Sequence, residues 1–120
     1  MPAIFHRDRE SANPFPGVNR MNIADRGDGS GAISMLIATI EPGAAILPHT
    51  HLVEEAFTIL EGDVRVLVGD TVYDVQGGGA TFVAPGNTVH GVRNVGTTVA
   101  RLVGAYPSVN VTAQRVERDF

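Results

Sequence analysis

Two residue types are missing from this chain, and each absence removes a class of chemistry. None of the 120 residues is cysteine, which excludes disulfide bonds, thiolate metal ligands and thiol catalysis. All nine basic residues are arginine, so a lysine Schiff base and a lysine general base are excluded as well. A reaction performed by this protein must therefore draw on other groups.

Long apolar runs and basic clusters are also lacking. No stretch approaches the roughly 20 apolar residues of a membrane-spanning helix, and the N-terminus has no basic-then-apolar signal pattern. The net charge of −4, without a basic patch, argues against a nucleic-acid partner. We therefore expect a cytoplasmic protein that binds a small molecule and neither membrane nor nucleic acid.

Glycine and proline, by contrast, are frequent. Fourteen glycines and seven prolines separate short apolar segments, a pattern typical of strands joined by tight turns. Gly69-Asp70 lies between two such segments and predicts a hairpin. The expected core strands are residues 33–40, 64–68, 71–75, 80–84, 89–94 and 99–105. No segment has a helical period, so we predict one all-β domain.

Three of the four histidines fall in two spaced blocks. The first is Gly43-x5-His49-x-His51-x3-Glu55-x6-Gly62, and the second is Gly79-x5-Pro85-x4-His90-x3-Asn94. Imidazole and carboxylate are common ligands of divalent transition metals. The blocks therefore direct attention to metal chemistry.

Strand geometry explains why this spacing suits a metal. If one extended strand carries His49, His51 and Glu55, their side chains share a face, and Glu54 points the other way. On a curved sheet, two such imidazoles can converge on one ion at roughly 2.1 Å each. His90 arrives from a different strand, so the site would form only in the folded chain.

A His-x-His pair alone is commonly no more than a polar strand face. Here the pair is accompanied by a carboxylate, by flanking glycines and by a second block that contains histidine. We interpret this combination as a site for one divalent transition metal, with the ligands His49, His51, Glu55 and His90. His6 lies outside both blocks and is expected on the surface.

The two blocks resemble the paired motifs of the cupin superfamily, and the resemblance covers roughly residues 30–105. The first block matches the family pattern throughout. In the second, Asn87 stands where the family usually has glycine, and asparagine tolerates a positive φ well. The 16 residues between Gly62 and Gly79 are similar in number to those of small microbial single-domain cupins. The resemblance implies a jelly-roll β-barrel, also called a double-stranded β-helix.

The two ends of the chain are less regular than the middle. Residues 1–30 are expected to form an N-terminal arm and first strand within the same domain, and residues 31–120 the barrel itself. Within the arm, residues 13–17 are interpreted as a loop or extended arm and residues 18–24 as a strand. Residues 112–118 are expected to form a charged edge strand.

Assembly is predicted from residues 33–40, which are apolar on both strand faces although a barrel has only one interior. The outward face therefore needs cover, and small cupins commonly form dimers. We expect a homodimer. The alternative is that the N-terminal arm covers its own barrel.

Side-chain alternation also predicts the pocket wall, although plain core packing is the simpler role for each residue. The pocket candidates are Met35, Ile37, Phe57, Ile59 and Val92. Because residues 33–40 are apolar on both faces, Leu36 and Ala38 are the alternative to the first two. Alternation cannot place Tyr73, Tyr106, Arg20 and Arg101.

Three imidazoles and one carboxylate leave two positions of an octahedral ion open. The first hypothesis is therefore a metal-dependent, dioxygenase-like oxidoreductase for a small molecule with adjacent oxygens. The alternatives are a non-catalytic metal-dependent binding protein and an isomerase or decarboxylase in which Glu55 acts as the base. Fe or Mn is favoured as the metal, and Ni, Co, Cu and Zn stay open.

Overall fold

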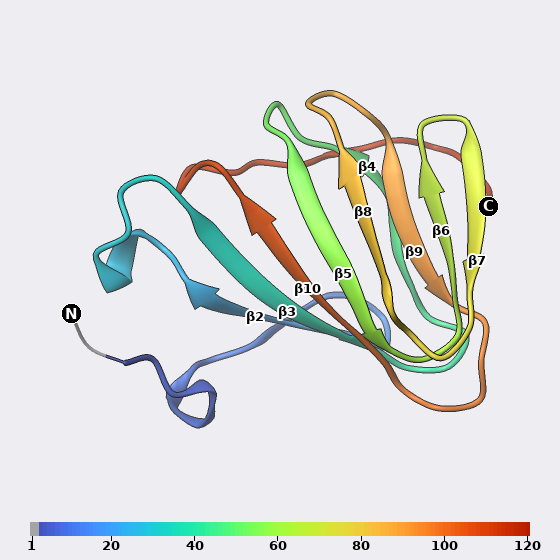
Figure 1. Cartoon of the computed structure of the whole chain (residues 1–120), viewed down its shortest axis with the longest axis horizontal. Helices are drawn as coiled ribbons and strands as arrows, with labels where there is room; N and C mark the ends of the chain where they lie inside the picture. The colour runs from blue at the N-terminus through green and yellow to red at the C-terminus, as the bar shows by residue number, and fades with distance from the viewer. Residues whose placement is uncertain (1–2) are drawn as a thin grey trace.

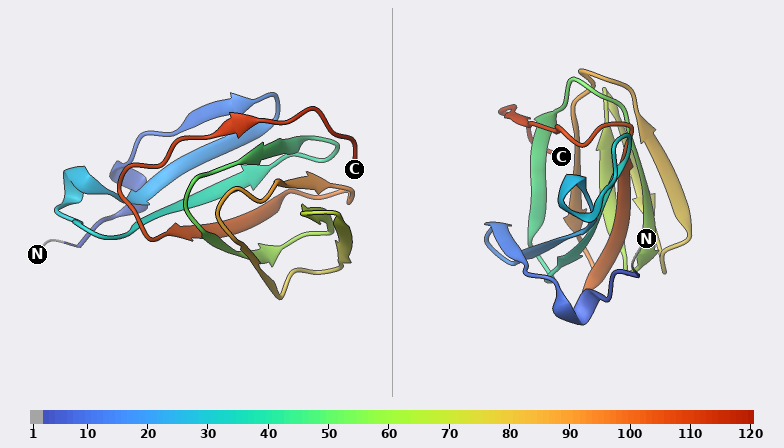
Figure 2. Two further views of the ribbon diagram at one scale, coloured as in Figure 1. Left: turned by 90° about the horizontal axis from the view of Figure 1, so that it is seen from above. Right: turned by 90° about the vertical axis from the view of Figure 1, so that its left-hand side faces the viewer.

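The fold is an all-β sandwich of two antiparallel sheets that face each other (Figures 1 and 2). The computed structural model describes residues 3–120, so residues 1–2 of the predicted arm lie outside it. The strands are β1 (Ala12–Phe15), β2 (Val18–Ala24), β3 (Ser34–Ile40), β4 (Ala45–Thr50), β5 (Glu55–Glu61), β6 (Val64–Val68), β7 (Thr71–Val75), β8 (Ala80–Ala84), β9 (His90–Asn94), β10 (Ala100–Tyr106) and β11 (Gln114–Arg115). Two short 3₁₀ turns, η1 (His6–Asp8) and η2 (Arg26–Asp28), complete the elements. The predicted all-β jelly roll is confirmed.

The chain crosses repeatedly from one sheet to the other. One sheet has the order β1-β2-β3-β10-β5-β8 and the other the order β11-β4-β9-β6-β7. Consecutive strands β4, β5 and β6 therefore lie in alternate sheets. Within residues 3–120, no helix is long and apolar enough to cross a membrane. The crossing from β4 to β5 matters most for function, because it lies inside the first histidine block.

The N-terminal region is more regular than the sequence suggested. The loop or extended arm predicted at residues 13–17 is wrong in part, because β1 forms a hairpin with β2 there. Gly17 makes the turn with a φ of 74°, and a Cβ at this position would lie 2.7 Å from the Cβ of Ala44. The predicted strand at residues 18–24 is β2, which pairs with β3 at the centre of its sheet. At the other end, the predicted edge strand is limited to β11 beside β4.

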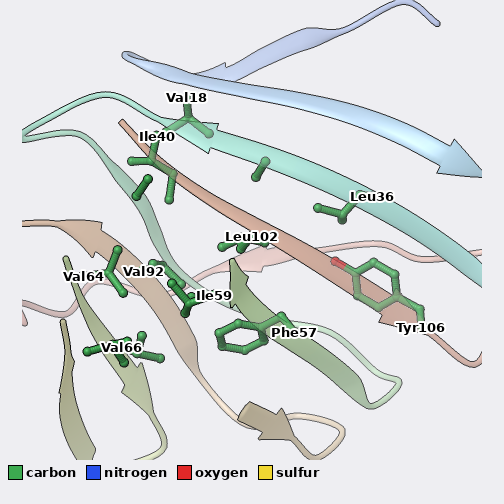
Figure 3. Close-up of a cluster of buried hydrophobic side chains, with 13 residues drawn as sticks. Val18, Leu36, Ile40, Phe57, Ile59, Val64, Val66, Val92, Leu102 and Tyr106 are labelled. Atoms are coloured by element: carbon green, nitrogen blue, oxygen red, sulfur yellow. The ribbon is translucent and has the colours of Figure 1, made fainter. Parts of the chain in front are cut away.

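Apolar side chains from both sheets fill the space between them (Figure 3). On β3, Leu36, Ala38 and Ile40 are buried, while the intervening residues are half-buried. Ile59 and Val64, from opposite sheets, are 1% and 0% exposed. Burying each such side chain contributes about 1.5–3 kcal/mol. This apolar interior fixes the spacing between the sheets and hence the positions of residues at their ends.

Two turns have the backbone conformations that their residues predicted. Gly69-Asp70 joins β6 to β7, and Gly69 has a φ of 62°. Asn87, with a φ of 61°, is the one non-glycine residue of residues 3–120 with a positive φ. Gly86 beside it has a different requirement, since a Cβ there would lie 2.5 Å from the carbonyl oxygen of Leu52. Together the two residues hold the β8–β9 turn against the β4–β5 connection.

Candidate metal centre

Four buried side chains meet at one end of the space between the sheets. His49 lies near the end of β4, His51 follows that strand, Glu55 begins β5 and His90 begins β9. Their exposed fractions are 8%, 4%, 6% and 4%, in that order. One potential ligand atom from each lies within 4.8 Å of the others. The four residues that the sequence singled out could therefore hold one metal ion.

The route by which they meet differs from the prediction. His49, His51 and Glu55 do not share one strand, because β4 ends at Thr50 and Glu55 belongs to the opposite sheet. The crossing between the sheets folds the first block around the site instead. Glu54 is exposed and points away, so the choice of Glu55 over its neighbour agrees with the structure.

Backbone carbonyls orient all three imidazoles. The Nδ1 atoms of His49, His51 and His90 lie 2.8, 2.8 and 2.9 Å from the carbonyl oxygens of Leu47, Thr112 and Thr88. A carbonyl can only accept, so each Nδ1 carries a proton and donates it. In neutral rings, this assignment leaves every Nε2 with a free lone pair directed at the centre of the cluster.

The distances between ligand atoms suit one shared ion. The Nε2 atoms of His49 and His51 are 3.1 Å apart, and the Nε2 of His90 is 2.8 Å from Oε1 of Glu55. Two ligands at roughly 2.1 Å from one ion and at right angles to each other are about 3.0 Å apart. Two lone pairs at that separation repel each other unless a cation lies between them. The donor set therefore fits a divalent metal.

Burial and pairing set the charge states of the cluster. Burial lowers the pKa of His49 to about 4, which keeps this ring neutral and able to bind a metal at neutral pH. Burial would raise the pKa of Glu55. Without a metal, protons on Nε2 of His51 and His90 can be donated to this carboxylate, and these contacts outweigh burial and hold its pKa at about 2. A metal at the centre of the cluster would take the place of those protons. For His51, burial acts downward, yet its contacts with Glu55 and Thr112 raise the pKa overall. Glu55 is therefore a carboxylate throughout the neutral range.

Two backbone features support this arrangement without adding a ligand. The backbone N–H of Asn87 donates to the carbonyl oxygen of His51 at 2.6 Å, which fixes the connection between β4 and β5. Gly104 on β10 leaves room for the carboxylate, since a Cβ there would lie 2.7 Å from Oε2 of Glu55. The sequence indicated the turn at Asn87, but it indicated neither of these two contacts.

The four side chains form part of the lining of a mainly apolar cavity of about 210 Å³. Pro14, Ala113 and Arg115 are the exposed residues of its lining, so its mouth lies where the first hairpin meets the C-terminal segment. Arg115 stacks over the ring of Phe15 at 5.5 Å and joins these two ends of the chain. The cavity is small and has a deep polar region at the four candidate ligands.

The predicted pocket residues are only partly correct. Phe57 and Val92 line the cavity, whereas Ile59 lies in the closed core. Met35 and Ile37 are wrong: Leu36 and Ala38 line the cavity instead, because β3 presents the opposite face to the interior. This error has a simple cause. A strand that is apolar on both faces does not reveal which face is inward.

The structure also places the four residues that alternation left open. Tyr106 and Arg20 line the cavity, whereas Arg101 pairs outside with Glu61 at 3.4 Å and Tyr73 is 44% exposed. The signal for Arg20 was its spacing of two residues from the apolar Val18 in a predicted strand. His6 is exposed in η1, as expected.

Tyr106 brings a hydroxyl group to the candidate ligands. Its oxygen lies 3.4 Å from Nε2 of His51. Burial and the charge of Glu55 raise the pKa of Tyr106 well above its usual value, with the charge of Arg20 acting in the opposite direction. The hydroxyl therefore stays protonated and can donate a hydrogen bond.

Known proteins resemble the chain in motif and fold. A family model described as Cupin domain matches residues 36–106. None of the curated proteins compared with the chain is similar to it. The family match spans every candidate ligand.

Solved structures extend the likeness to nearly the whole chain. The polyketide cyclase RemF from Streptomyces resistomycificus has a TM-score of 0.82 at 20% identity, over 99% of this chain and 87% of that one. The oxalate decarboxylase of Lactobacillus farciminis has a TM-score of 0.80 at 19% identity, over 92% of this chain and 34% of that one. An oxalate oxidase has a TM-score of 0.74 at 26% identity, over 89% of this chain and 60% of that one. The first two likenesses are likenesses of fold.

Proposed function

The chain belongs to the cupin domain family, and on that premise we propose that it is a metal-dependent enzyme acting on a small organic molecule held through two of its oxygens. One observation carries the proposal: three Nε2 lone pairs and one carboxylate converge in a small, mainly apolar cavity. The described residues of the cavity include no serine, cysteine or lysine that could act as a nucleophile. A bound metal would be the strong electrophile of the site.

The ligand set indicates which ions and substrates fit. Three imidazoles and a carboxylate leave two positions of a six-coordinate ion for a chelating ligand, or for a ligand and dioxygen. Fe(II) or Mn(II) is the proposed metal, and Ni(II), Co(II), Cu(II) and Zn(II) also accept this donor set. When bound, the metal would polarise the substrate's oxygens and lower the pKa of a substrate hydroxyl.

The protein's own residues have three roles in this proposal. Phe57, Leu36 and Val92 shield the reacting end of the cavity from water. Tyr106, which stays protonated, donates a hydrogen bond to a substrate oxygen beside His51. Glu55 acts first as a ligand, and it could serve as a base only after leaving the metal.

Two forms of the chemistry are proposed. The first is dioxygenase-like, in which both atoms of dioxygen enter the products. The second is oxygen-independent isomerisation, decarboxylation or ring closure, favoured by the proton that Tyr106 holds beside the candidate ligands. The fold likeness to a polyketide cyclase and an oxalate decarboxylase is consistent with this second form.

Anaerobic loading followed by exposure to air separates these forms. Protein loaded with Fe(II), Mn(II), Ni(II) or Co(II) is mixed with diketones, flavonols and hydroxy acids without oxygen, and products are identified by mass spectrometry before and after air is admitted. Products only after air, together heavier than the substrate by one dioxygen, support the first form. Products formed without oxygen support the second form. The His90→Ala variant is the control for metal that is not bound at the site.

A binding protein would behave differently in the same experiment. Chelating ligands would change the spectrum of the bound metal and yet be recovered unchanged with and without air. That result, obtained for every ligand that binds, would contradict the enzymatic proposal.

A further inference from the structure

Arg20 is a charged residue inside the cavity that the metal proposal does not use. It lies on β2 directly opposite Ala38 of β3, and both residues line the cavity. Val18, two residues earlier on the same strand face, is 1% exposed. The guanidinium is therefore on the inner face of the sheet, in the same cavity as His51 and Tyr106.

The Arg20 guanidinium is unpaired in the part of the chain that the structure describes. Within residues 3–120 its Nε is buried without a hydrogen-bond partner, and none of the ion pairs involves Arg20. A buried donor without a partner destabilises the folded protein, and more so when it is charged. A ligand that accepts from this group would offset that destabilisation.

Arg20 forms no ion pair with a carboxylate of residues 3–120, although it also lines an open outer pocket with Asp8, Glu10 and Asp25. Asp28 accepts two hydrogen bonds from Arg9, at 2.7 and 2.8 Å, and Asp25 lies 3.7 Å from the same guanidinium. In the cavity, Glu55 is paired with His90 and His51. Arg20 is thus left free to bind a group that is not part of the protein.

The charge of the cavity points to the sign of that group. Its charged lining residues are one carboxylate, Glu55, and two guanidinium groups, Arg20 and Arg115, although the whole chain carries a net charge of −4. A divalent metal on the four candidate ligands would make the cavity more positive still. An anion is therefore attracted to this cavity, against the charge of the whole protein.

We propose that Arg20 binds a carboxylate of the substrate, so that the substrate is a small organic acid whose other oxygens reach the metal. Arginine suits this task because its planar group can donate two parallel hydrogen bonds to one carboxylate. The cavity of about 210 Å³ limits the size of that acid, since sites for drug-sized ligands occupy roughly 300–1,000 Å³. This inference rests on the proposed function, because it gives the chelating substrate a second point of attachment.

Two hydroxamates that share one chelating group test the assignment. Acetohydroxamate chelates a metal and has no carboxylate, whereas succinic monohydroxamate adds a carboxylate at the far end. Both are titrated into the Co(II)-loaded protein, and Kd is read from the visible spectrum of the metal. We expect the carboxylate probe to bind the unaltered protein about 10- to 100-fold more tightly, the usual effect of hydrogen bonds to a charged group.

Arg20→Met should remove this preference and leave the Kd of acetohydroxamate unchanged. Arg20→Lys should restore part of the preference, because it keeps the charge but loses the paired donors. Arg101→Met removes the same charge outside the cavity and should leave both affinities unchanged. Metal content and melting temperature are measured for each variant.

The outcomes separate this inference from the function on which it rests. Equal affinities of the two probes for the unaltered protein would overturn the assignment of Arg20, even if Arg20→Met does not fold. A loss of affinity in Arg20→Met that is equal for both probes would overturn it too. If neither probe changes the Co(II) spectrum, the proposed function itself fails, and this inference fails with it.

Discussion

The interior of the sandwich has two halves. The open half lines the cavity, and the closed half is filled by apolar side chains that do not reach the cavity. The same strands contribute to both halves. On the inward face of β5, Glu55 is a candidate ligand, Phe57 is a cavity wall residue and Ile59 is closed core. On β9, His90 is followed by Val92 and then by the buried Asn94. Figure 3 shows the same division, with the cavity residues Tyr106 and Phe57 toward one end of the cluster and the core residues Val64 and Ile40 toward the other.

The difference between the halves shows how a small domain can separate stability from chemistry. The members of the core cluster that do not line the cavity are Ile40, Ile59, Val64, Val66, Val75 and Ala100, and all of them are apolar. The open half contains the carboxylate of Glu55, three imidazoles and the half-buried guanidinium of Arg20, whose burial opposes folding. We infer that the closed half stabilises the fold and that the open half depends on it.

Shortening a side chain in the closed half should have the largest effect on stability. Ile59→Ala should lower the free energy of unfolding by about 2–5 kcal/mol, through lost burial and the cavity left behind. Metal affinity of the folded protein should not change. Urea denaturation and metal titration test the two expectations, and Leu60→Ala, at a side chain that is 47% exposed, is the control. A loss of metal affinity with full stability would contradict the separation of the halves.

Metal should stabilise the open half without being needed for the fold. Because the ion binds the folded state, excess metal should raise the melting temperature, with about 2.7 kcal/mol of stabilisation at a hundredfold excess over Kd. The metal-free protein should keep its β-sheet circular dichroism at 25 °C. If the metal-free chain lacks that signal, the closed half does not suffice for folding.

A single methyl group should disturb the open half alone. Gly104→Ala places a Cβ 2.7 Å from Oε2 of Glu55 in the present geometry, so the carboxylate must shift. We expect metal affinity to fall about 10-fold or more, as when other groups that orient ligands are changed. Gly31→Ala is the matched control, because a Cβ there meets no atom within 4 Å. Unchanged metal affinity in Gly104→Ala would contradict this expectation, because it would mean that the Glu55 carboxylate can shift without weakening metal binding.

The smallest effect concerns the outer face of the six-stranded sheet, which lies outside both halves. Leu60 and Val83 are 47% and 54% exposed there, and Ile37 and Val103 are half-buried. We expect a homodimer in solution that covers this apolar face, weakened by deletion of residues 1–16 or by Val83→Glu. Light scattering at micromolar concentration measures the mass. A mass near 12.7 kDa would show a monomer and contradict the expectation.

Much of the closed half could be predicted from the sequence. The segments at residues 64–68, 71–75 and 80–84 are β6, β7 and β8 with the predicted bounds. They are short, contain mainly β-branched and aromatic residues, and are bounded by turn residues, so local rules suffice. Asn87 likewise adopts the positive φ that its place in the second block predicted.

The open half depends on long-range pairing, and prediction succeeded there only in part. The motif spacing identified the four residues that meet, but the single-strand geometry offered for His49 and Glu55 was wrong because the chain changes sheets between them. Arg20 and Tyr106 enter the cavity through the pairing of β2 and β10 with β3. Alternation within one strand carries no information about such pairing.

The central claim is that four side chains bind one metal ion, and measuring the metal content of single-residue variants tests it most directly. Each of His49→Ala, His51→Ala, Glu55→Ala and His90→Ala should reduce the metal-to-protein ratio sharply, because each removes one of four converging ligands. Glu54→Ala, which changes an exposed neighbour of the same type, should leave the ratio unchanged. A loss in Glu54→Ala as deep as that in Glu55→Ala, or full metal content in any of the four variants, would contradict the site.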